Sequence, residues 1–306
     1  MANRWWIYQR ERFPLLAHTP IIAAFSLSAI SYSALIRGAH HLPGWKSCVV
    51  AFASSFLFFL QLRLADEFKD FEEDSRYRPY RPVPRGLIKL GELGWVWAGC
   101  IVLQLALALW LAPRLIVLLA LTWIYLLLMS KEFFARRWLK ARPITYMVTH
   151  MAIMPLVDLY TTSCDWVPAG LSHPPRGLLW FLLVSYFNGM VVEIGRKIRS
   201  PQDEEPGVET YSFLWGRRNA VLAWLGMVAC TAGFAYVAAQ GIGFARPILI
   251  LLLTLFFSAM AVGAFVLHGA VARRGKYVEA MAGVWSLLMY LSLGFVPMVA
   301  RQWGLG

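Results

Sequence analysis

Long apolar runs limit what this chain can fold into more than any other feature. Of its 306 residues, 59% are hydrophobic and only 15% are charged, a balance that a soluble domain of this size does not carry. About 20 consecutive apolar residues cross a bilayer as a helix. Runs of spanning length occupy residues 15–36, 45–65, 90–111, 113–130, 143–163, 177–195, 219–240, 246–268 and 279–300. We therefore expect an all-α, polytopic membrane protein, in which nine transmembrane helices form one domain, residues 1–306, as a bundle around a central cavity.

The distribution of lysine and arginine predicts how the spans are oriented. The N-terminal segment and the loops around residues 63–89, 131–142, 196–218 and 273–276 hold 23 basic residues, whereas the other side of the predicted membrane holds six. Loops rich in Lys and Arg stay in the cytoplasm, so we expect the N-terminus and these loops there and the C-terminus on the opposite side. The basic residues alternate with apolar runs and form no single patch, so the net charge of +12 does not indicate nucleic-acid binding.

Several kinds of chemistry have no signal in the sequence. The four cysteines are scattered without a pair spacing, so we infer neither a disulfide framework nor a zinc site. The sequence contains no Walker loop, GxSxG elbow or HExxH motif. Its histidines lack metal-ligand spacing, and His150 in the fifth span is typical of a packed histidine. Asp158 lies toward the outer end of the same span, where we expect solvation at the membrane interface.

The most informative polar stretch follows the second apolar run. Six of the seventeen acidic residues lie between positions 66 and 74. Asp66, Asp70 and Asp74 are spaced four apart, which on a helix places them along one face with neighbouring Cβ atoms about 6 Å apart. Three such carboxylates repel one another unless a cation holds them. The spacing therefore predicts a divalent metal site for Mg²⁺, shared with a phosphorylated substrate. The alternative is a solvated helix end of mixed charge.

Arginines and prolines follow this acidic stretch. No glycine or proline interrupts residues 51–78, so a nearly continuous helix is expected to run through Asp74 and to end at Pro79. Arginine forks suit phosphate oxygens, which makes the arginines beyond Asp74 candidates for holding a diphosphate. They are Arg76, Arg78, Arg81 and Arg85. Their alternative role is the positive-inside signal alone.

A second polar segment follows the sixth apolar run. Glu193 lies at the cytoplasmic end of that run, where an ionisable group is a functional candidate. It is expected either to bind the metal or to pair with Arg196 or Lys197. In the loop beyond lie Asp203, Glu204, Glu205 and Glu209, of which we expect most to be solvated and one to be a candidate to close the metal shell. Lys131, at the end of the fourth span, is either a diphosphate contact or an interfacial anchor.

Together these features resemble the UbiA superfamily of intramembrane prenyltransferases. The resemblance covers most of the chain in layout and is most specific at residues 63–86, which hold the three aspartates and the Arg-Pro-Val-Pro-Arg-Gly run at 81–86. Gly207-Val208-Glu209-Thr210-Tyr211 before the seventh span also matches. The family's second motif is usually a pair of aspartates four apart after the sixth span. Here Glu193 is followed four residues later by Lys197, so Glu193 is the best match and Asp203 the second.

The resemblance implies transfer of an isoprenyl group from a prenyl diphosphate to a lipophilic or aromatic acceptor within the membrane. Mg²⁺, with Arg and Lys, would neutralise the leaving diphosphate, and an apolar cavity would shield the allylic carbocation from water. The implied metal ligands are Asp66, Asp70, Asp74, Glu193 and Asp203. The implied catalytic residues are Asp66, Asp70, Arg81, Lys131 and Glu193, and the implied diphosphate ligands are Arg76, Arg78, Arg85 and Lys197.

Other functions stay open at this point. A membrane terpene cyclase would use the same ionisation but let a double bond of the substrate attack the cation. A cation permease would use the acidic cluster to select metal ions, although no acidic pair lies at mid-membrane in two different spans. A CDP-alcohol phosphotransferase also uses intramembrane aspartates, but its Asp-Gly and Ala-Arg pairs with a later GxxxD run are absent.

Overall fold

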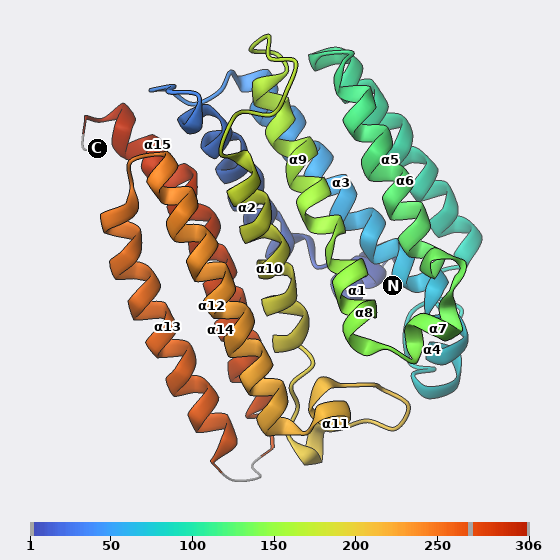
Figure 1. The fold of residues 1–306 in the computed structure, drawn as a ribbon. Coiled ribbons are helices and arrows are strands. Elements are labelled where there is room, and N and C mark those ends of the chain that lie inside the picture. The colour runs from blue at the N-terminus through green and yellow to red at the C-terminus, as the bar shows by residue number, and fades with distance from the viewer. Residues whose placement is uncertain (1–2, 269–271, 305–306) are drawn as a thin grey trace.

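The computed structural model describes residues 3–268 and 272–304, and every regular element within them is helical. The helices are α1 (Arg4–Arg12), α2 (Leu15–Ile36), α3 (Trp45–Lys69), α4 (Phe71–Tyr77), α5 (Leu90–Leu111), α6 (Leu115–Ser130), α7 (Arg136–Lys140), α8 (Pro143–Met151), α9 (Ile153–Trp166), α10 (Leu178–Gly195), α11 (Tyr211–Trp215), α12 (Arg217–Gly241), α13 (Ala245–Leu267), α14 (Gly275–Leu293) and α15 (Phe295–Gln302), with short turns η1 (Glu132–Phe134) and η2 (Pro201–Asp203). The long helices run alongside one another, with α13 at one edge and α5 and α6 at the other (Figure 1). The predicted all-α class is confirmed.

Seven helical segments of the described chain are long and apolar enough to cross a membrane. They are Leu15–Ile36, Trp45–Lys69, Leu90–Leu111, Leu178–Gly195, Arg217–Gly241, Ala245–Leu267 and Gly275–Gln302. Each matches one of the predicted runs. The fourth run forms α6, which has only 16 residues, and the fifth is divided between α8 and α9. The count of nine spans therefore stays a prediction.

Prolines explain where the predicted runs are interrupted. The fifth run breaks at Ala152, and Pro155 follows three residues later. A proline has no N–H to donate to the carbonyl four residues earlier, so Pro155 leaves the carbonyl of residue 151 without its helical partner. The ninth run breaks at Gly294, again three residues before a proline, Pro297. A hydropathy pattern does not detect such breaks, because proline is tolerated within apolar segments.

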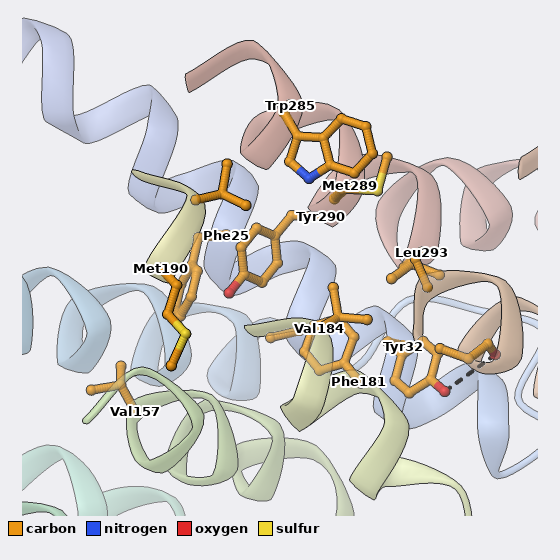
Figure 2. Packing of buried hydrophobic residues seen from close by; sticks show 14 of the residues in the cluster. Phe25, Tyr32, Val157, Phe181, Val184, Met190, Trp285, Met289, Tyr290 and Leu293 are labelled. Atoms are coloured by element: carbon orange, nitrogen blue, oxygen red, sulfur yellow. Dashed lines mark hydrogen bonds between the residues drawn. The ribbon is translucent and has the colours of Figure 1, made fainter. Parts of the chain in front are cut away.

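Large apolar side chains both fill the bundle and cover its outside. Trp224 and Trp285 are completely buried, whereas Trp95 is 81% and Ile250 70% exposed. An apolar exterior of this kind is stable against lipid. Inside, the Tyr290 ring lies 4.8 Å from the Phe25 ring, so α14 packs directly on α2 (Figure 2).

Asp158 corrects one expectation from the sequence. Its side chain is fully buried and not solvated at an interface, because α9 packs against α2, α3, α6 and α10. The hydroxyl of Tyr290 donates a hydrogen bond to Asp158 Oδ2 at 2.8 Å and lies 3.1 Å from Ser185 Oγ. Asp158 is thus part of a polar contact between α9, α10 and α14 inside the bundle.

One end of the bundle carries α4, α7 and α11, and we call it the aspartate end (bottom of Figure 1). There α1 and the loop at 78–89 pack on α3 and α5 through a small apolar cluster: Tyr8, Leu64, Val83, Ile88 and Leu93. A cavity of about 520 Å³ lies beside α1, lined mainly by apolar side chains that include Trp5, Tyr8, Phe13, Leu60 and Leu64. The cluster and the cavity both lie next to the stretch that contains the three aspartates.

The break at Gly294 gives a test of the packing. A Cβ atom added there would lie 2.0 Å from the carbonyl oxygen of Ser28, so Gly294→Ala must push α14 and α15 away from α2. We expect a loss of about 1–3 kcal/mol and a lower melting temperature in detergent. Gly283→Ala on α14 is the matched control, since nothing lies within 4 Å of its Cβ position and alanine favours a helix. Equal melting temperatures for the two variants would contradict the close approach.

Candidate active site

Asp66 and Asp70 lie where α3 meets α4. Asp70 has non-helical dihedral angles, φ −97° and ψ 4°. Its N–H still donates to the Asp66 carbonyl at 2.9 Å, and the Asp74 N–H donates to the Asp70 carbonyl at 2.8 Å. The predicted helix through Asp74 is therefore interrupted only at Asp70, and α4 ends at Tyr77, before Pro79. The two carboxylates stay one turn apart on a nearly continuous helix.

The Asp70 carboxylate has no ion pair among the described residues. Burial raises the pKa of Asp70; the Lys69 ammonium opposes this shift, and the carboxylates of Asp66, Asp74 and Glu73 add to it. Asp66 is 38% exposed and lies 3.6 Å from Arg63 Nη1 and 3.4 Å from Lys69 Nζ. A half-buried carboxylate among other carboxylates attracts a further cation.

Asp74 has a different environment. It is only 2% exposed. Arg81 Nη1 donates to Asp74 Oδ2 at 2.5 Å, Arg78 Nη1 lies 3.1 Å from Oδ1, and Arg12 Nη2 lies 4.0 Å from Oδ2. Two of the arginines predicted to bind diphosphate therefore contact this carboxylate. The metal role predicted for Asp74 stays a prediction.

Glu67 is a buried site residue that the sequence analysis missed. It accepts a hydrogen bond from Arg12 Nε at 2.5 Å and one from Arg63 Nη2 at 2.8 Å, and it is 2% exposed. Arg63 and Glu67 are four residues apart on α3. This spacing of opposite charges is the sequence signal that could have indicated the pair. Through Arg12, α1 is tied to both Glu67 and Asp74.

Glu193 ends α10 as a buried, ion-paired carboxylate. Arg196 Nε donates to it at 2.7 Å, and Lys197 Nζ lies 2.9 Å from its Oε1. Of the two roles predicted for Glu193, pairing is thus observed, and metal binding stays a prediction. The charge of Glu193 raises the pKa of Arg196, and Asp66 adds to this effect. The ends of α3 and α10 are therefore close enough for Asp66 to act on Arg196.

The loop after α10 folds back on the aspartate stretch. Gly207 has φ +75°, and a Cβ atom there would lie 2.6 Å from the Tyr77 ring. The Tyr211 N–H donates to the Lys197 carbonyl at 3.0 Å, and Lys197 Nζ lies 5.5 Å from the Tyr211 ring centroid. The two segments singled out in the sequence, 66–86 and 193–211, thus lie against each other.

Four other predicted site residues lie outside this arrangement or face solvent. Asp203 Oδ2 accepts a hydrogen bond from the Arg273 N–H at 2.6 Å, so it contacts the start of α14. Arg85 Nη2 lies 3.0 Å from Glu11 Oε1 on α1. Arg76 and Lys131 are exposed. Their predicted roles are not tested by these contacts and stay predictions.

Lys69, Tyr146 and His150 form a contact that the sequence did not reveal. Lys69 Nζ donates to the Tyr146 hydroxyl at 2.8 Å. The Tyr146 and His150 rings stack with centroids 3.7 Å apart. Tyr146 and His150 are one turn apart on α8, so they connect the end of α3 with the interior of the bundle. Lys69 and Tyr146 are 77 residues apart in the sequence, so their contact carries no spacing signal.

The segment between α6 and α8 contacts the aspartate stretch, where Arg136 Nη2 donates to the Lys69 carbonyl at 3.3 Å. Glu132, Phe133 and Phe134 of η1 all have positive φ angles, of 49°, 51° and 58°. Three successive left-handed residues other than glycine cost about 1 kcal/mol or more each. This turn brings the Phe133 ring to 6.1 Å from the His150 ring. Sequence propensities do not predict such a turn.

The carboxylates fit Mg²⁺ when a substrate supplies the other ligands. Among the described residues, no group of three or more His, Cys, Asp or Glu side chains lies close enough to hold a metal ion alone. Mg²⁺ is commonly bound by one or two carboxylates together with substrate phosphates. Asp66 and Asp70 match that description, since they are adjacent oxygen donors and Asp70 is unpaired.

The chain belongs to the UbiA prenyltransferase family, whose sequence model matches residues 26–287. It is therefore an integral membrane protein, and its class is that of the intramembrane prenyltransferases. The resemblance inferred from the aspartate stretch is confirmed. The comparisons lend no support to a terpene cyclase. No curated protein sequence matches the chain.

Solved structures share the fold at low sequence identity. A UbiA homologue from Aeropyrum pernix K1 superposes with a TM-score of 0.65 at 15% identity, covering 88% of this chain and 96% of that one. A structure described for digeranylgeranylglyceryl phosphate synthase gives 0.62 at 16% identity, covering 98% and 99%. A UbiA homologue from Archaeoglobus fulgidus bound to DMAPP and Mg²⁺ gives 0.56 at 13% identity, covering 95% and 99%.

Proposed function

We propose that this chain transfers an isoprenyl group from a prenyl diphosphate to a lipophilic or aromatic acceptor, with Mg²⁺ bound at the aspartate end of the bundle. The observation that carries the proposal is the Asp70 carboxylate, which has no ion pair among the described residues and lies one turn from Asp66, whose charge acts on Arg196 at the end of α10. The homologue from Archaeoglobus fulgidus, which has the same fold, was solved with DMAPP and Mg²⁺.

Each group at this end has a role in the proposed reaction. Asp66 and Asp70 would hold Mg²⁺, which when bound supplies positive charge to a departing diphosphate. Arg196 and Lys197 extend from the opposing helix end and would contact the diphosphate oxygens, while Glu193 keeps both side chains in place. The prenyl chain would extend into the apolar bundle, away from water.

The arginines beyond Asp74 divide into two groups in this proposal. Arg78 and Arg81 position the loop by pairing with Asp74. Only the guanidinium N–H groups that do not contact Asp74 would be free to bind a diphosphate. Arg76, Arg85 and Lys131, which are exposed, would form a basic rim of the site at the membrane surface. Asp203 already accepts a hydrogen bond from the Arg273 N–H before α14, so we rank it below Asp66 and Asp70 as a metal ligand.

We also propose the topology that the charge distribution predicts. The aspartate end would face the cytoplasm with the N-terminus, and the C-terminus would lie on the other side, within one domain of nine spans. The supporting observation is the count of 23 basic residues against six on the two predicted sides.

A screen of prenyl diphosphates tests the proposal. Purified protein is mixed with dimethylallyl, geranyl, farnesyl or geranylgeranyl diphosphate and Mg²⁺, with and without phenols or lipid alcohols as acceptors. We expect diphosphate release that EDTA abolishes, and a product whose mass is the acceptor plus the prenyl group. A hydrocarbon formed without acceptor would indicate a cyclase instead. Metal flux into proteoliposomes without any prenyl diphosphate would indicate a permease.

A further inference from the structure

His150 is a buried histidine with one ring nitrogen in use. It is 4% exposed. Its Nδ1 lies 2.8 Å from the carbonyl oxygen of Tyr146, one turn earlier on α8. Its Nε2 is buried and has no hydrogen-bond partner among the described residues. An unpaired buried ring nitrogen costs free energy unless another group binds it, so Nε2 is available to a bound molecule.

The hydrogen bond at Nδ1 fixes which nitrogen carries the proton. A carbonyl oxygen only accepts, so Nδ1 must be the donor. The hydroxyl of Thr149, 3.4 Å from the same nitrogen, already donates to the Thr145 carbonyl at 2.9 Å. A second proton on Nε2 would be a buried N–H without an acceptor. The hydrogen-bond network therefore assigns a neutral ring with a free lone pair on Nε2.

The position of His150 suits a base acting at the first carbon of a prenyl group. His150 lies four residues beyond Tyr146, so it is about 6 Å further into the bundle than the contact with Lys69. A Cβ atom on Gly189 would lie 3.3 Å from the sulfur of Met151, which follows His150. Gly189 is itself one turn deeper than Glu193. His150 is therefore one turn below the charged groups, where a bound diphosphate would join its prenyl chain.

Other titratable groups near this point are already engaged. The charges that act on His150 are those of Lys69 and Asp66 on α3 and Glu193 on α10, and the Tyr146 ring stacks on it from its own helix. The Tyr146 hydroxyl accepts from Lys69, and Glu193 is paired with Arg196 and Lys197. Asp158 lies level with Ser185, about 12 Å deeper along α10 than Glu193. The free lone pair at the right depth belongs to His150.

We propose that His150 Nε2 is the general base that takes the proton lost by the acceptor, an inference that rests on the proposed function. The bond between the first prenyl carbon and the diphosphate oxygen breaks, and its electron pair leaves with the diphosphate. An electron pair of the acceptor forms the new bond to that carbon. The acceptor loses one proton to Nε2, and the resulting imidazolium releases it to water when the product leaves.

The test separates proton removal from ionisation. His150→Gln is compared with the unchanged protein for diphosphate release and for acceptor transfer, using the substrates of the screen. We expect transfer to fall about 100-fold or more, as for loss of a general base. Diphosphate release should stay within about threefold, because the cation is then captured by water as prenyl alcohol. His268→Gln is the matched control, since its Nδ1 makes the same bond to the carbonyl four residues earlier but the residue is exposed.

Several results would overturn the role of His150. Equal losses of transfer and release in His150→Gln would indicate that the residue only supports the structure, and unchanged transfer would exclude it as the base. ¹⁵N NMR of labelled histidine in the intact protein tests the tautomer without any substrate, and a protonated Nε2 at neutral pH would contradict the proposal. Absence of diphosphate release by the unchanged protein would instead count against the proposed function.

Discussion

Asp70→Ala is expected to lower the rate of Mg²⁺-dependent diphosphate release by about 10³-fold or more. The protein should still insert and fold. Asp70 caps α3 without an ion pair, and its backbone hydrogen bonds do not involve the side chain. Removing the carboxylate would therefore remove a proposed metal ligand and little else. The measurement is diphosphate release over a range of Mg²⁺ concentrations, with melting temperature in detergent as the check on folding.

Glu72→Ala is the matched control for this variant. Glu72 lies two residues away in the first turn of α4 and is exposed. The substitution changes the local charge by the same amount, and we expect full activity. Turnover retained by Asp70→Ala would refute the assignment of Asp70, and equal losses in both variants would indicate a general effect of charge.

Asp74→Ala is expected to act on stability first. Asp74 is 3% exposed at its side chain and lies within 4.0 Å of three arginines. Removing one partner of a buried ion pair leaves the other charges uncompensated, which costs about 3–5 kcal/mol. We expect the melting temperature to fall by roughly 10 °C, because the loop at 78–89 and α1 both lose their anchor.

The response to Mg²⁺ distinguishes the two roles considered for Asp74. If the carboxylate mainly holds arginines, protein that remains folded at low temperature keeps the Mg²⁺ requirement of the unchanged chain. A variant that melts normally but needs far more Mg²⁺ would instead make Asp74 a metal ligand. Asp74→Asn keeps the size of the side chain but removes its charge. Like Asp74→Ala, it should lower the melting temperature and leave the Mg²⁺ requirement unchanged.

The sequence predicted the parts of the fold that depend on hydropathy and spacing. Long apolar runs required helices, and three aspartates four apart required a common face near the end of α3. The break at Ala152 lies within a run that stays apolar on both sides, so its cause, the missing N–H of Pro155, does not change the hydropathy. The burial of Asp158 depends on the packing of α9 among four other helices, which no local pattern records.

The site could be predicted only in part for the same reason. Asp66 and Asp70 lie on one helix, and their spacing is visible in the sequence. The contact of Lys69 with Tyr146 joins residues 77 positions apart, and that of Arg12 with Glu67 joins residues 55 positions apart. Such pairs are determined by the assembled bundle. Glu193 was found because an ionisable group at the end of an apolar run is costly.

The attachment of α1 has a practical consequence for handling the protein. Arg12 holds Glu67 and Asp74, and Arg4 at the other end of α1 pairs with Glu92 at 2.6 Å. An affinity tag joined ahead of Arg4 would therefore disturb a helix whose ion pairs connect it directly to the aspartate stretch. The last helix, α15, lies at the opposite end of the bundle (Figure 1). Tags and fluorescent reporters belong there if activity is to be measured.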